Sequence, residues 1–160
     1  MQDWMNKYFL VVFPFFFFGI WLFSTYWVAV TSGWRLLAKR FRMQGDYSGQ
    51  KWKMQSARMR WLTGYNGCLT IAADNAGLFI VPFVLFRVWH PALFIPWTEI
   101  TARGKTVFFL FNMIELRLGR SEEIPFVINA NLAAKIEAAA GSSWPAGYTK
   151  ATESAPPPIA

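Results

Sequence analysis

The sequence predicts an α+β membrane protein, in which one N-terminal transmembrane helix is followed by a β domain of about seven strands and a C-terminal helix. Three observations lead to this prediction. Of the 160 residues, 54% are hydrophobic and 19% are aromatic, which is too apolar for an ordinary soluble protein. A long uncharged stretch lies near the N-terminus. Short apolar runs separated by turn residues fill the second half of the chain.

Residues 8–34 form the predicted transmembrane helix. No charged side chain occurs between Tyr8 and Trp34. A helix of this length is about 40 Å long, and the hydrocarbon core of a bilayer is about 30 Å thick. The preceding segment, 1–7, contains only Asp3 and Lys7 as charged residues, so a cleaved signal peptide is the weaker interpretation.

Small residues recur along one face of this helix. Thr25, Ala29 and Gly33 are each four positions apart, and such spacing lets a second helix approach closely. We therefore expect a helix-docking face at these three positions, which would bind other transmembrane subunits of a larger complex.

The basic residues are concentrated directly after the helix. Between Arg35 and Arg60, eight basic residues face the single Asp46, which gives this stretch the whole net charge of +7. The positive-inside rule then predicts an inner (cytoplasmic) membrane protein with its N-terminus outside and its C-terminal domain in the cytoplasm.

Residues 35–58 are predicted to form a basic amphipathic juxtamembrane helix and linker. Apolar and basic side chains alternate at helical spacing here, as expected for a helix at the bilayer surface. Two interpretations stay open, namely a stop-transfer sequence without lipid selectivity and a site for anionic lipids. A nucleic-acid partner is not expected, because no nucleic-acid-binding motif accompanies the charge. The predicted anionic-lipid contacts are Arg35, Lys39, Arg40 and Arg42.

The β domain is predicted to span residues 59–140, with its first strand beginning slightly earlier. Alternating apolar residues and turn signals mark each strand. A helix follows over 129–141, with Asn129 at its start and Gly141 as its stop. The expected strands are 57–65, 68–74, 77–81, 94–102, 106–111, 113–119 and 122–128.

An apolar excursion over residues 82–94 interrupts this domain. Pro82, Pro91 and Pro96 argue against a second straight transmembrane helix in this part of the chain. Two interpretations stay open. The excursion either dips into the membrane interface, with Arg87 and His90 meeting phosphates, or it closes one end of the barrel or packs on the first helix. The residues assigned to the interfacial loop are Phe83, Phe86, Arg87, Trp89 and His90.

The order of strands, the "IPWTEI" strand start and the closing helix resemble the pleckstrin-homology-like (PH-like) group, including its GRAM and bacterial PH relatives. The leading helix and the GL…FR…HP…LFIPW pattern are also similar to small uncharacterised bacterial single-pass membrane proteins. The resemblance implies a PH-like β-barrel over roughly residues 32–140. It implies no activity, and phosphoinositide binding is not implied because no matching basic loop joins the first strands.

Catalytic chemistry has little support in the sequence. Cys68 and His90 are the only candidates for a catalytic nucleophile and its base. Cys68 lies in an apolar strand, where a structural thiol is the usual finding. The carboxylates are sparse and scattered. We therefore expect no catalytic residue, no metal, no cofactor and no small-molecule substrate.

The C-terminal tail, residues 141–160, is rich in proline and in small, polar side chains, so we expect it to be extended. Its predicted anchors are Trp144 and Tyr148. Taken together, the sequence favours a non-enzymatic accessory or scaffold subunit of a larger membrane complex, by analogy a respiratory or photosynthetic one. The alternative is a membrane-surface module that binds anionic lipids through residues 35–60, and an enzyme is a distant third.

Overall fold

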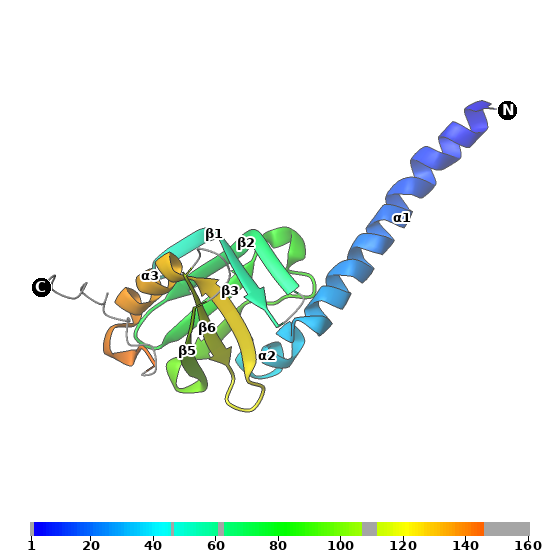
Figure 1. Cartoon of the computed structure of the whole chain (residues 1–160). Helices are drawn as coiled ribbons and strands as arrows, with labels where there is room; N and C mark the ends of the chain where they lie inside the picture. Colours follow the sequence, from blue (N-terminus) through cyan, green and yellow to red (C-terminus); the bar gives the residue numbers. More distant parts are fainter. Residues whose placement is uncertain (1, 46, 61–62, 107–111, 146–160) are drawn as a thin grey trace, which may run out of the picture.

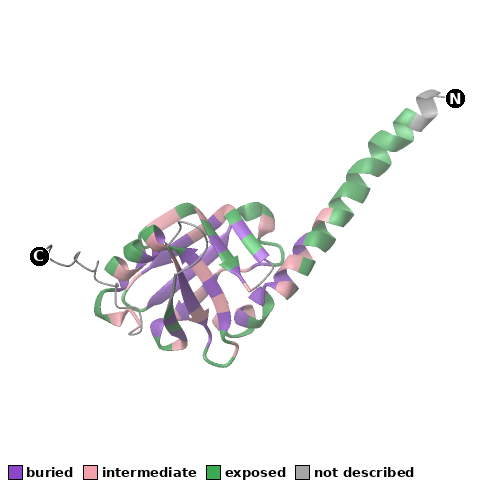
Figure 2. Cartoon of the chain, in the orientation of Figure 1, coloured by how far each residue is buried: buried purple, intermediate pink, exposed green. Residues whose placement is uncertain are grey.

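The computed structural model describes residues 2–45, 47–60, 63–106 and 112–145, and places a long helix beside a β domain (Figure 1). Helix α1 (Gln2–Thr31) contains 30 residues. Its segment Asn6–Thr31 is long and apolar enough to cross a membrane. From residue 6 onwards its side chains are exposed until the last turns (Figure 2), so the chain itself leaves most of this apolar surface uncovered.

A glycine corner joins α1 to the short helix α2 (Trp34–Phe41). Gly33 has a φ of +80°, which L side chains rarely adopt. A Cβ at this position would lie 2.7 Å from Cδ1 of Ile124 and 3.3 Å from Nε of Arg60. Glycine is therefore required here both by the backbone conformation and by the packing of the corner against the domain.

The β domain is a single antiparallel sheet of seven strands that curls into a nearly closed barrel. Two meanders, β1 to β4 and β5 to β7, are joined where β1 pairs with β7 at Ala57 and Ile128. The strand order is β4-β3-β2-β1-β7-β6-β5, so β4 and β5 form the edges. The strands are β1 (Lys51–Met59), β2 (Thr63–Ala73), β3 (Gly77–Pro82), β4 (Leu93–Pro96), β5 (Ile100–Thr106), β6 (Asn112–Leu118) and β7 (Ile124–Asn129).

Helix α3 (Ala130–Ala140) packs on the barrel and confirms the predicted C-terminal helix. The side chain of Asn129 caps it by accepting a hydrogen bond from the backbone N–H of Asn131, at 2.6 Å. Leu132 and Ile136 are buried in the main core, which consists mainly of inward-facing strand residues and also includes Trp34 and Leu37 of α2. Figure 1 shows α3 on the side of the domain away from α1.

The first strand begins earlier than predicted. β1 starts at Lys51, inside the predicted linker, and the strand expected over 57–65 instead crosses the turn between β1 and β2. The pairing of β1 with β2 shifts register twice, between Trp52 and Ala57. Met54 also has a φ of +55°. This irregularity destroys the alternation of apolar and polar residues that marks a strand in a sequence.

The strand predicted over 94–102 is divided in the structure. A turn of 3-10 helix, η2 (Trp97–Glu99), separates β4 from β5 and carries the chain from one edge of the sheet to the other. The indole N–H of Trp97 donates to the backbone oxygen of Asp74, at 2.7 Å, and fixes this crossing. The strand predicted over 106–111 lies almost entirely outside the described residues.

Candidate membrane-facing site

A buried group of four side chains joins the end of α1 to the β domain. We call Ser32, Trp34, Tyr65 and His90 the junction cluster. The hydroxyl oxygens of Ser32 and Tyr65 are 3.1 Å apart, and Nε2 of His90 lies 3.1 Å from the same Tyr65 oxygen. The ring of Trp34 contacts both Tyr65 and His90, with centroids 5.6 and 5.2 Å away. The cluster thus connects α1, α2, β2 and the excursion.

His90 is almost fully buried, with 1% of its surface exposed. Burial lowers its pKa, against the opposing effect of its hydrogen bond to the backbone of Phe86. Nδ1 lies 3.1 Å from the carbonyl oxygen of Phe86, and a carbonyl can only accept, so Nδ1 carries the proton. In the neutral ring Nε2 then accepts from Tyr65. The prediction that His90 faces lipid phosphates is wrong, because the imidazole is inside the junction.

Trp34 anchors the same junction from the helical side. Its indole N–H donates to the carbonyl oxygen of Pro91, at 2.9 Å, and its side chain is fully buried in the main core. The second limb of the excursion is therefore tied to the corner between α1 and α2.

The tip of the excursion, residues 83–89, is apolar and exposed. It begins where the backbone N–H of Phe83 donates to the carbonyl of Cys68, at 2.7 Å, and contains the 3-10 turn η1 (Val84–Phe86). Leu85 is 55% exposed and Val88 is 58% exposed. Residues that closed the end of a barrel would be buried, so the exposed tip does not fit a barrel plug, whereas Trp89 does pack on the first helix, as the same alternative allowed.

The excursion lies directly against α1. The ring of Trp89 meets the ring of Tyr26 edge to face, with centroids 5.3 Å apart. Nη1 of Arg35 donates to the Tyr26 hydroxyl, at 2.9 Å. The Arg35 guanidinium carbon also lies 5.2 Å from the centre of the same ring. Aromatic and cationic side chains are thus gathered at the point where α1 leaves the domain.

The predicted lipid-contacting cations divide into two groups. Arg40 is paired within the domain, since its Nη1 lies 3.4 Å from Oε2 of Glu122 and its Nη2 lies 3.9 Å from Oε1 of Glu99. Lys39 and Arg42 are exposed. A guanidinium that already faces two carboxylates offers no net positive charge to an anionic lipid, so the prediction for Arg40 does not fit its surroundings.

The predicted helix-docking face is already covered by the chain itself. Thr25 and Ala29 are buried, and Gly33 lies against Ile124. The small side chains therefore allow the last turns of α1 to approach the domain closely. A partner helix cannot occupy these three positions while the junction is intact.

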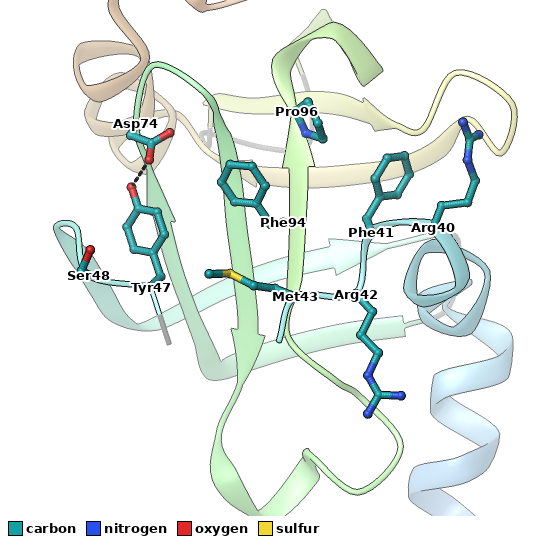
Figure 3. Close-up of a pocket in the computed structure, with 9 residues that line it drawn as sticks. All are labelled: Arg40, Phe41, Arg42, Met43, Tyr47, Ser48, Asp74, Phe94 and Pro96. Carbon is teal, nitrogen blue, oxygen red and sulfur yellow. Dashed lines mark hydrogen bonds between the residues drawn. The ribbon is translucent and has the colours of Figure 1, made fainter. Parts of the chain in front are cut away.

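An open hollow of about 670 Å³ lies between the segment after α2 and strand β4 (Figure 3). Tyr47 borders it and stacks on Phe79, with ring centroids 5.2 Å apart. Its hydroxyl donates to Oδ2 of Asp74, at 2.9 Å. Burial and this carboxylate raise the pKa of Tyr47 to about 12. The Tyr47–Asp74 pair thus holds the segment over the outer face of β3.

The described residues offer little for catalysis. Burial raises the pKa of the Cys68 thiol, which disfavours the nucleophilic thiolate. Among those same residues no group of three or more His, Cys, Asp or Glu side chains is placed to hold a metal ion. The arrangement is suited to packing and to contact with a surface.

The tail begins against the domain. Trp144 packs on Trp97, with ring centroids 5.6 Å apart. Its indole nitrogen is buried and has no hydrogen-bond partner within the described part of the chain. Tyr148, the second predicted anchor, lies outside the described residues.

Comparison of the chain with protein-family models, with curated proteins and with solved structures finds no match.

Proposed function

We propose that the protein is a non-enzymatic, membrane-anchored module whose β domain lies against the bilayer surface. In this proposal α1 crosses the membrane and the tip of the excursion enters the interface beside it. The contact between Trp89 and Tyr26 is the observation that carries the proposal. It joins two exposed apolar surfaces, one on the helix and one on the excursion, at the same end of the domain.

The energetics of the exposed tip support this arrangement. Full burial of a valine or leucine side chain stabilises a protein by about 1.5–3 kcal/mol. Val84, Leu85 and Val88 are all more than half exposed, so the folded chain leaves several kcal/mol of this stabilisation unused. Amphipathic segments insert their apolar face about 5–10 Å into the boundary between headgroups and acyl chains, and insertion to this depth would bury these three side chains.

The proposal includes an orientation and a fold family. The excess of basic residues after α1 supports an N-terminus outside and a cytoplasmic domain, in the inner membrane. The seven-stranded sheet and the C-terminal helix are compatible with a PH-like barrel, and we propose membership of that group.

An accessory subunit of a larger membrane complex is the second candidate function. Three phenylalanines stack along one face of α1, with ring centroids 5.2 Å apart for Phe9 and Phe13 and 6.2 Å apart for Phe13 and Phe17. All three are exposed. If a partner helix docks, we propose that it docks on this aromatic row, since the small-residue face is covered.

Photocrosslinking in native membranes tests both candidates. A benzophenone side chain is introduced at Leu85 in one variant and at Phe13 in another. We expect position 85 to form adducts with lipids, which would be detected by mass spectrometry. Adducts of position 85 with water-soluble proteins, and none with lipid, would contradict the membrane-surface module. A reproducible protein adduct at position 13 would support the accessory subunit, and lipid adducts alone at position 13 would count against it.

A further inference from the structure

The arginines near the end of α1 point in different directions. Figure 3 shows the side chain of Arg42 directed toward the end of the domain that carries α1 and the excursion, while that of Arg40 is directed the other way. Arg40 reaches Glu99 and Glu122 there. The fold thus separates a neutralised arginine from one that faces the proposed membrane surface.

Arg42 is held beside the second limb of the excursion. It forms an isolated β-bridge with Leu93, and the next residue, Met43, donates its backbone N–H to the carbonyl of Ala92, at 2.9 Å. The position of this arginine is therefore set by main-chain hydrogen bonds.

Arg87 lies on the tip of the same excursion. It borders a second hollow, of about 410 Å³, whose other walls are Gly45, Phe79, Val81 and Ala92. Its neighbour Val88 is exposed and apolar. A cation between such side chains would sit at the headgroup level once the tip is immersed.

Arg35 completes the group on the side of α1. Its hydrogen bond to Tyr26 and its position over that ring fix it next to Trp89. Within the described part of the chain, none of Arg35, Arg42 and Arg87 has a carboxylate partner. Three arginines to which the described residues supply no carboxylate thus lie on the segments that meet at the α1 end of the domain.

We propose that Arg35, Arg42 and Arg87 bind the headgroup phosphates of anionic phospholipids, with Arg87 holding one phosphate at the mouth of the second hollow. This inference rests on the proposed immersion of the excursion. A zwitterionic headgroup also carries a phosphate, but its ammonium group would be repelled by three guanidinium groups. The cluster therefore selects lipids with a net negative charge.

Native mass spectrometry of the full chain tests this selectivity. The protein is extracted from bilayers containing equal parts of phosphatidylglycerol and phosphatidylcholine, and the ratio of the two lipids retained on it is measured. We expect phosphatidylglycerol to be enriched on the wild type. Each of Arg35→Gln, Arg42→Gln and Arg87→Gln should lower the ratio, by roughly fivefold if each cation contributes about 1 kcal/mol.

Two variants with the same loss of charge serve as controls. Lys135→Gln removes a cation from α3, and Arg40→Gln removes one that is already paired. Both should keep the wild-type ratio. If the triple arginine variant keeps it too, or if Lys135→Gln lowers it as much as Arg87→Gln does, the proposed site is wrong.

The crosslinking experiment separates this inference from the proposed function. Lipid adducts at position 85, together with a phosphatidylglycerol ratio that the triple arginine variant leaves unchanged, would overturn the arginine site alone. Absence of lipid adducts at position 85 would overturn the membrane-surface module. The arginine site would then fail with it, because Arg87 would not reach the headgroups.

Discussion

Nε2 of His90 and the hydroxyl oxygen of Tyr65 lie 3.1 Å apart in the interior of the junction. Tyr65 belongs to the barrel and His90 to the excursion, so this bond fixes the excursion to the sheet. Ser32, at the end of α1, lies on the other side of the same hydroxyl. The direction in which α1 leaves the domain thus depends on a small hydrogen-bonded group.

We predict that removal of the Tyr65 hydroxyl weakens this junction. In a Tyr65→Phe variant the buried Nε2 of His90 loses its partner, and an unpaired buried polar group costs about 1–3 kcal/mol. Thermal unfolding of the detergent-solubilised protein, followed by near-UV circular dichroism, measures the loss. A double-mutant cycle with Ser32→Ala should reveal coupling between the two hydroxyls. Strictly additive effects would show that they act separately.

The stability of the domain should fall in mildly acidic solution. An unfolded chain protonates its histidine near pH 6.5, whereas burial lowers the pKa of His90 in the folded protein. The unfolded state therefore binds the proton first, and stability decreases as the pH falls through about 6.5 until the folded pKa is reached. We expect the melting temperature to be lower at about pH 5 than at about pH 7.5.

A His90→Gln variant serves as the control for this pH dependence. It should show a smaller difference in melting temperature between the two pH values, because the titrating group is absent. An unchanged difference would assign the effect to other groups.

The corner at Gly33 should not tolerate a side chain. A Gly33→Ala variant must place a Cβ at positive φ and 2.7 Å from Ile124, so we expect a loss of about 1–3 kcal/mol in the free energy of unfolding. Gly19→Ala is the matched control, since nothing lies within 4 Å of a Cβ at that position. Equal melting temperatures for the two variants would mean that the corner relaxes freely.

The proposed orientation makes a labelling prediction. In a Cys68→Ser background, a cysteine at Asp3 should react with a membrane-impermeant maleimide added to intact cells, and a cysteine at Glu122 should react only after lysis. The opposite pattern would place the β domain outside the cell, against the positive-inside rule.

Much of the architecture was predictable from local pattern. The uncharged run over 8–34 predicts a long helix, and the alternation around Ile114 and Leu116 predicts β6. Asn129 and Gly141 are the capping residues at the two ends of α3, as the sequence predicted. The start of β1 was missed because its register shifts remove the alternation on which strand prediction depends.

The candidate site was only partly predictable. The apolar, proline-broken composition marked the excursion but left open whether its tip is exposed or packed, and no local pattern indicates that His90 turns inward to Tyr65, which is 25 positions away. The small residues at Thr25 and Ala29 were recognised as a close-packing face, and only the fold reveals that the chain's own domain covers it. Contacts between distant segments set both outcomes.

The depth of the excursion in the bilayer tests the central claim most directly. A nitroxide spin label is attached at Leu85→Cys in a Cys68→Ser background, and the full-length protein is reconstituted into lipid vesicles. The matched control is a label at Lys135→Cys on α3, away from α1. Accessibility to oxygen and to a water-soluble nickel chelate is then compared by power-saturation electron paramagnetic resonance. We predict that the label at position 85 is accessible to oxygen and shielded from the chelate, while the label at 135 shows the reverse. Equal exposure of both labels to the chelate would contradict the claim that the domain lies against the membrane through its excursion.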